Sequence, residues 1–245
     1  MGKIIAVVSG KGGTGKTTAV GAIGSCLGAM GRKTLCVDCD FGLRNLDITL
    51  GMTNRAVADL VHVLTGVCDI KDACVKHPTI ENLWFLSAPP TYESEFDMNS
   101  RARLLSMIRG NFDYCLLDAP AGIGSGFNFA ASGADMAIIV ATGDAASVRD
   151  GQVVSGRLRE LGISDVRLLV NRVSPAMYSA VGATVDSVID TIGAQLIGII
   201  REDSDVPFSA NLEIPLVLYS RRRAARGFLR AARRIDGQRV PVSAK

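Results

Sequence analysis

The chain has 245 residues and a net charge of +3, with 48% hydrophobic and only 5% aromatic residues. This profile fits aliphatic strands buried on both faces by helices, and its length suits one large α/β domain spanning residues 1–245. Because no run of 18 apolar residues occurs and the first residues lead directly into an apolar run, we expect no transmembrane helix, no signal peptide and a cytoplasmic protein.

Apolar, strand-like runs alternate with helix-like patterns along the chain. The predicted strands are Lys3–Ser9, Thr34–Asp38, Asn82–Ala88, Tyr114–Asp118, Met136–Ala141, Val166–Asn171, Leu196–Ile200 and Leu216–Tyr219. The predicted helices are Lys16–Met30, Val57–Leu64, Arg101–Ile108, Ala146–Leu161, Val181–Ile192 and Arg222–Ile235. This alternation predicts a three-layer α/β/α sandwich with a mostly parallel central sheet.

A phosphate-binding loop follows the first predicted strand. Residues 10–17 read GKGGTGKT, which fits the pattern G-x-x-x-x-G-K-[ST] between a strand and a helix. Glycines let backbone N–H groups point at phosphate oxygens, and the helix that follows adds its positive N-terminal end. We expect Lys16 to reach the β- and γ-phosphates of a nucleotide and Thr17 to ligate Mg²⁺. The candidate nucleotide-binding residues here are Gly10, Lys11, Gly12, Gly13, Thr14, Gly15, Lys16, Thr17 and Thr18.

A second lysine, Lys11, stands early in this loop. The form KGGTGKT is the deviant Walker A motif, and the chain resembles the MinD/ParA family of P-loop ATPases that carries it. The resemblance implies that Lys11 reaches the nucleotide of a partner subunit, and hence an ATP-dependent homodimer in which Lys11, Lys16 and Asp40 are catalytic. A solvated loop lysine is the alternative.

Three carboxylates end predicted strands. Asp38 and Asp40 follow the second strand and Asp118 ends the apolar run from Tyr114, so all three are expected at the edge where open α/β sheets bind ligands. We expect Asp40 to hold the attacking water, while Asp38 and Asp118 contribute to the Mg²⁺ site with Thr17. Residues 38–47 (DCDFGLRNLD) and 118–123 (DAPAGI) resemble the two switch segments of the MinD branch.

Asn171 and Arg172 follow a late strand and are the candidates for base recognition. The N-K-x-D pattern typical of guanine recognition is absent here, and an asparagine can pair with N6 and N7 of adenine. We therefore expect ATP and Mg²⁺ as ligands. Residues 201–203 (RED) stand where relatives carry PED beside the base, so the second base contact stays open.

Two segments suggest partners. The helix at 147–162 opens with SVRD, as in MinD-like proteins near their regulator-binding surface; a plain sheet-covering helix is the alternative. The basic helix at about 221–236 and the tail 237–245 belong to a region, 219–245, with nine basic residues against one acid. A closing helix packed on the sheet is one interpretation, and an anionic membrane surface or DNA as partner is another. A separate terminal amphipathic helix, usual in MinD, is missing from the sequence, so peripheral association with the plasma membrane stays open.

The function expected from the resemblance is an ATP-dependent dimerising switch that positions the cell-division site. ParA-like partition ATPases and FlhG-like flagellar-number regulators share the phosphate-binding residues and stay as alternatives. Biosynthetic ligases on this scaffold lack the early lysine. The six cysteines are expected as reduced, mostly buried thiols, because Cys36 and Cys39 point to opposite faces of their strand and no second pair completes a metal site.

Overall fold

The computed structural model describes residues 1–41, 44–89, 98–174 and 184–242. An eight-stranded sheet runs through its centre in the order β3-β4-β2-β5-β1-β6-β7-β8. The strands are β1 (Lys3–Val8), β2 (Thr34–Asp38), β3 (Val75–Lys76), β4 (Leu83–Leu86), β5 (Tyr114–Asp118), β6 (Met136–Ala141), β7 (Val166–Val173) and β8 (Gln195–Arg201). All neighbouring strands pair in parallel except β3 and β4, which are antiparallel.

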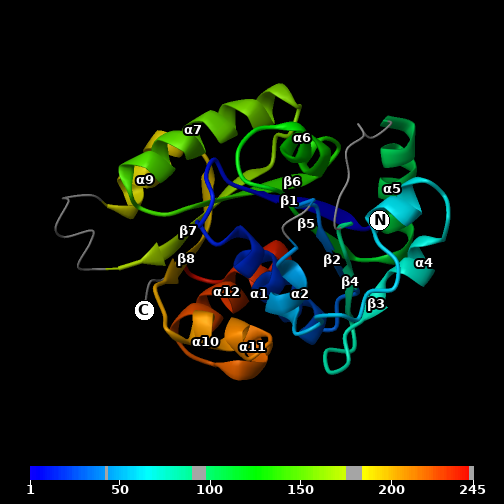
Figure 1. The fold of residues 1–245 in the computed structure, drawn as a ribbon. Helices are drawn as coiled ribbons and strands as arrows, with labels where there is room; N and C mark the ends of the chain where they lie inside the picture. Colours follow the sequence, from blue (N-terminus) through cyan, green and yellow to red (C-terminus); the bar gives the residue numbers. More distant parts are fainter. Residues whose placement is uncertain (42–43, 90–97, 175–183, 243–245) are drawn as a thin grey trace.

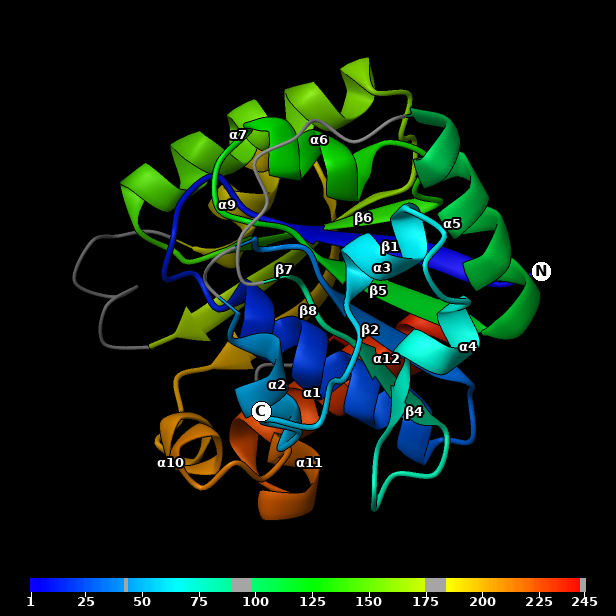
Figure 2. The ribbon, with the colours of Figure 1, turned by 45° about the vertical axis from the view of Figure 1, so that its right-hand side comes forward.

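Helices cover both faces of the sheet, as Figures 1 and 2 show. One face carries α3 (Leu60–Leu64), α4 (Ile70–Ala73), α5 (Met98–Asn111), α6 (Ser125–Ala131), α7 (Ala145–Glu160) and α9 (Val185–Ile192). The other carries α1 (Lys16–Ala29), α2 (Leu46–Leu50), α10 (Asp205–Asn211), α11 (Leu216–Tyr219) and α12 (Arg223–Ile235). Two hydrophobic cores result, one on each face, and the predicted three-layer sandwich is confirmed.

Strand residues alternate between the two cores. In β2, Leu35 and Val37 belong to the core under α5 and α6, whereas Cys36 belongs to the core under α1. Cys39, three positions after Cys36, lies in the first core, so the two thiols do point to opposite faces as predicted. All six cysteines are free thiols.

The predicted strand Leu216–Tyr219 is wrong, because this segment forms the short helix α11. The N–H groups of Leu218 and Tyr219 donate to the carbonyl of Pro215, 2.8 and 3.1 Å away. A four-residue apolar run has no periodicity long enough to separate a strand from a buried helical turn. Pro215, which cannot donate to a strand ladder, was the signal for the turn that starts α11.

The basic helix α12 closes the core under α1. Its apolar face contains Ala225, Phe228, Ala232 and Ile235, which are at most 6% exposed, and it packs against α1 and β8. The closing-helix interpretation is therefore confirmed, and this face of α12 is not free for a membrane. The helices of the described residues include none whose length and apolar character would suit a bilayer crossing.

Candidate nucleotide-binding site

The phosphate loop leaves β1 and enters α1 in a conformation that depends on glycine. Gly15 has a φ of 91°, in the left-handed region, and a Cβ there would lie 2.3 Å from the side-chain nitrogen of Asn171. The Asn171 side chain in turn donates to the carbonyl of Thr14 at 2.8 Å. Gly15 is thus required both by the turn and by the close approach of β7.

Ser9, at the start of the loop, links its two lysines. The Lys16 ammonium donates to the Ser9 hydroxyl at 2.8 Å, and this hydroxyl donates to the carbonyl of Lys11 at 2.6 Å. Lys16 is only 8% exposed. Burial lowers the pKa of Lys16, while the charges of Asp118 and Asp40 act in the opposite direction. Sequence inspection missed Ser9, although its position directly before the loop was a usable signal.

Lys11 lies in an ion pair with Asp144 of its own chain, with 2.7 Å between the ammonium and a carboxylate oxygen. Asp144 also caps α7 by accepting from the N–H of Ser147 at 3.0 Å, and it accepts from the Thr142 hydroxyl at 2.5 Å. Burial raises the pKa of Asp144, but the hydrogen bonds from Lys11, Thr142 and Ser147 outweigh it and lower the pKa to about 2. The early lysine therefore has a partner within the chain.

Asp38 and Asp118 lie side by side at the carboxyl ends of β2 and β5. They are paired in register and are at most 2% exposed. Asp38 accepts from the N–H groups of Asp40 and Leu46, at 2.9 and 3.3 Å, and so anchors the segment that joins β2 to α2. Burial raises the pKa of Asp38 to about 6. Burial, together with the negative charge of Asp38, raises the pKa of Asp118 to about 8.

The residues present fit Mg²⁺. One oxygen of Asp118 is buried without a hydrogen-bond partner among the described residues, and the Thr17 hydroxyl hydrogen-bonds this carboxyl group. Burial disfavours the charged form of both carboxyl groups, and a cation bound between them would favour it. Among the described residues, no group of three His, Cys, Asp or Glu side chains could hold a metal ion. Phosphate oxygens and water would complete the ligand set, as is usual for Mg²⁺.

Asp40 lies beside this pair and is partly buried. Burial raises the pKa of its carboxyl group, and the charge of Lys16 partly offsets this effect. The Gly122 N–H donates to the Ser9 carbonyl at 3.1 Å, so the segment after β5 also reaches the phosphate loop. The predicted phosphate, magnesium and water residues thus converge at one edge of the sheet.

A cavity of about 550 Å³ adjoins the loop on the side of β7 and β8. Gly13, Gly15 and Thr18 line it from the loop, and Asn171 and Arg172 line it from β7. Its far wall consists of residues 200–204 and, from the helices, Val206, Pro207, Ala210 and Phe228. Its place next to the phosphate loop and its size suit a nucleoside, because ligand pockets of this kind typically have about 300–1,000 Å³.

Asn171 and Arg172 hold their places through local contacts. The side-chain Oδ1 of Asn171 accepts from the Arg172 N–H at 2.9 Å, so the Asn171 side chain retains one N–H and one lone pair for a base. Arg172 has a φ of 54° and pairs with Glu202 at 3.3 Å. The sequence did not predict α10 as a wall of this cavity, although Pro207 in its first turn was a helix-start signal.

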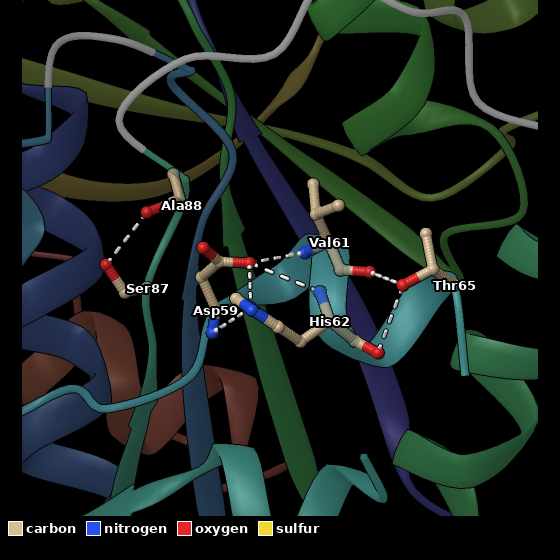
Figure 3. Close-up of polar contacts among 6 residues, drawn as sticks. All are labelled: Asp59, Val61, His62, Thr65, Ser87 and Ala88. Atoms are coloured by element: carbon tan, nitrogen blue, oxygen red, sulfur yellow. Dashed lines mark hydrogen bonds and ion pairs between the residues drawn. The ribbon is translucent and has the colours of Figure 1, made fainter. Parts of the chain in front are cut away.

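A polar group at the rim of the sheet has a structural role (Figure 3). Asp59 caps α3 by accepting from the N–H groups of Val61 and His62 at 2.9 and 3.2 Å, and its carboxylate lies 2.9 Å from the His62 ring. The Thr65 and Ser87 hydroxyls donate to the nearby carbonyls of Val61 and Ala88. Each of these contacts is local, so we read the Asp59–His62 pair as a helix cap.

The fold, the phosphate loop with its early lysine, and the strand-end carboxylates define a P-loop ATPase of the deviant Walker A type. A family model described as an AAA domain matches residues 2–152. The septum site-determining protein MinD of Thermotoga maritima is 35% identical over 99% of this chain and 91% of its own length. The chain belongs to the MinD family.

Solved structures agree with this assignment. MinD in a MinC:MinD cell division protein complex from Aquifex aeolicus has a TM-score of 0.92 at 36% identity, covering 98% of both chains. MinD from Pyrococcus horikoshii, complexed with Mg-ADP, has a TM-score of 0.84 at 29% identity, covering 96% of both chains.

Proposed function

We propose that this chain is a septum site-determining ATPase that works as an ATP-dependent, dimeric switch. The observation that carries the proposal is the convergence of Lys11, Lys16, Asp38, Asp40 and Asp118 beside a cavity of nucleoside size. The ParA-like and FlhG-like alternatives are not favoured, because MinD relatives match nearly the whole chain at 35–37% identity.

The proposed roles follow from the positions of the residues. Lys16 binds the β- and γ-phosphates, and Thr17, Asp38 and Asp118 hold Mg²⁺ directly or through water. Mg²⁺ bound there supplies positive charge against the phosphate oxygens. Asp40 orients the water that attacks the γ-phosphate, and ADP and phosphate are released.

Lys11 is proposed to act across a dimer interface. Its ammonium is bound to Asp144 of its own chain, and side chains of both residues are about 40% exposed or less. To reach the partner's nucleotide, Lys11 must exchange Asp144 for phosphate oxygens. This exchange conserves an ion pair, so the cost of breaking the internal contact is largely offset.

We also propose a binding surface for a regulator and a cellular location for this protein. A MinC-like regulator is proposed for α7, whose N-cap residue Asp144 contacts Lys11 of the phosphate loop. The protein is proposed to act in the cytoplasm as one domain, with peripheral membrane association or DNA binding through the exposed arginines near α12 as additions to test.

Phosphate release from ATP tests the enzymatic part. We expect Mg²⁺-dependent turnover that EDTA abolishes, and a loss of about 10²–10³-fold in Lys16→Ala and Asp40→Asn. Lys33→Ala is the matched control, because Lys33 is an exposed lysine before β2, at the opposite edge of the sheet. Unchanged turnover in Lys16→Ala would contradict the proposal.

A further inference from the structure

Exposed apolar side chains are concentrated on α10, on α11 and in the turn that joins them. Five of the eleven large hydrophobic residues that are exposed among the described residues lie within twelve consecutive positions. They are Phe208, Leu212, Ile214, Leu218 and Tyr219, between 37% and 58% exposed, and we call them the α10–α11 patch. Single exposed apolar residues need no explanation, whereas several that are close together are typical of a surface that binds another molecule.

Arginines border the patch. Arg221, Arg222, Arg223 and Arg226 follow it directly and are all exposed. None of the four forms an ion pair within the described part of the chain. Between residues 204 and 226 the one exposed acid is Glu213. The patch therefore combines apolar contact area with several uncompensated positive charges.

The patch is held rigidly. The Ser220 hydroxyl donates to Asp205 at 2.6 Å and accepts from the Arg222 N–H at 3.2 Å. Asp203 accepts from the N–H groups of Asp205 and Ala224, both at 3.1 Å. These bonds tie α10, α11 and the start of α12 together, which lowers the entropy that binding a partner would cost.

The patch is also separate from α7 and close to the nucleotide cavity. Figures 1 and 2 show α10 and α11 side by side on the face of the sheet opposite α7. Val206, Pro207 and Ala210 of α10 line the cavity beside the phosphate loop. α10 also contacts α2, which follows the segment anchored by Asp38. An occupant of the patch would therefore touch elements that surround the nucleotide.

The composition favours a protein as the occupant. Arginine, tyrosine and phenylalanine are enriched in protein interfaces and their hot spots, whereas lysine is depleted, and no lysine occurs between residues 204 and 226. Arginine pairs with carboxylates through two parallel hydrogen bonds, which gives specificity beyond simple charge. Duplex DNA would use the arginines and leave the apolar side chains uncovered.

We propose that the α10–α11 patch and its bordering arginines bind an acidic segment of a partner protein that carries apolar anchor residues. Leucine or aromatic anchors cover Phe208, Leu212 and Leu218, and carboxylates pair with Arg222, Arg223 and Arg226. This surface is additional to the regulator surface proposed on α7.

A charge-swap binding experiment tests the proposal on the full chain. The probes are two fluorescent synthetic peptides with leucines at helical spacing, one with glutamates and one with lysines at the remaining positions. We expect the glutamate peptide to bind the wild-type chain and the lysine peptide to bind at least about tenfold more weakly. The double variant Phe208→Ser/Leu212→Ser should bind the glutamate peptide about tenfold more weakly or worse. The triple variant Arg222→Glu/Arg223→Glu/Arg226→Glu should bind the lysine peptide more tightly than the glutamate peptide.

Val153→Ser is the matched control, since Val153 is an apolar residue of α7 that is 53% exposed. ATP turnover reports that the variants are folded, because the substituted residues are outside the proposed catalytic site, and the peptide readout does not depend on turnover. Binding that ignores the peptide charge or survives both sets of substitutions would overturn the proposal. So would binding to vesicles of phosphatidylglycerol and phosphatidylcholine, lost in the same variants, without binding to the glutamate peptide.

Discussion

Gly10 and Gly12 show how the phosphate loop depends on individual glycines. A Cβ on Gly10 would lie 2.4 Å from the Cβ and 2.9 Å from the backbone carbonyl of Asp150 in α7, whereas one on Gly12 would meet nothing within 4 Å. Because the obstacle at Gly10 includes backbone, the loop and α7 must move apart to admit a methyl group.

We therefore expect Gly10→Ala to lower the free energy of unfolding by about 1–3 kcal/mol and Gly12→Ala to change it little. Thermal unfolding of both variants without nucleotide measures the difference. Equal melting temperatures would show that Gly10 is not packed against α7 as described.

Asp144 allows a prediction about how stability depends on pH. Its pKa is about 2 in the folded chain, against an ordinary value of about 3.9 in the unfolded chain. A lowered folded-state pKa means that the carboxylate contributes stability above about pH 4 and that this contribution is lost as the pH falls towards 2.

Asp144→Asn should therefore cost about 1 kcal/mol, since the ion pair is partly exposed and screened while the cap of α7 is weakened. The difference from wild type should be constant between pH 5 and 8 and should shrink below about pH 4. Urea unfolding at several pH values measures it. A difference that grows towards low pH would contradict the assigned ion pair.

Among the helices, α12 allows a direct prediction about stability. Phe228 is fully buried between α1 and β8 and also lines the cavity. Phe228→Ala should lower the free energy of unfolding by about 3–5 kcal/mol, which is the usual cost of deleting a buried aromatic ring. Arg233→Ala, an exposed position on the same helix, should cost less than about 0.5 kcal/mol. Chemical denaturation compares the two, and equal costs would contradict the packing.

The elements differ in how far the sequence predicted them. Strands β2, β5 and β6 have the predicted bounds, because each is a buried apolar run between turn signals. The helices α1, α7 and α12 are long enough for their periodicity to be read. The short elements α2, α4, α6, α10 and α11 were missed or assigned wrongly, since packing against neighbours stabilises them more than their own sequence does.

In the candidate site, too, local motifs could be predicted from the sequence, whereas contacts between distant residues could not. Motif spacing predicted the phosphate loop, Asp38, Asp40, Asp118 and Asn171, because β1, β2, β5 and β7 bring their carboxyl ends to one edge. The pair between Lys11 and Asp144 joins residues 133 positions apart. No local pattern encodes such a contact, and it becomes visible only when β6 is placed next to β1.

In the molecule as a whole, we expect two surfaces to bind different partners. The loop, the strand-end carboxylates and the first turn of α7 form the face that is proposed to meet a second copy around ATP. The α10–α11 patch lies on the face of the sheet opposite α7 and is proposed to meet a different partner.

The most direct test of the central claim is the sedimentation velocity of the purified chain with Mg²⁺ and either ATP or ADP. We expect a dimer in ATP, stabilised further by Asp40→Ala, and a monomer in ADP. Lys11→Ala should stay monomeric in both nucleotides, while Lys33→Ala should behave as wild type. A wild-type chain that stays monomeric in ATP, or a Lys11→Ala variant that dimerises equally well, would contradict the proposed ATP-dependent dimer.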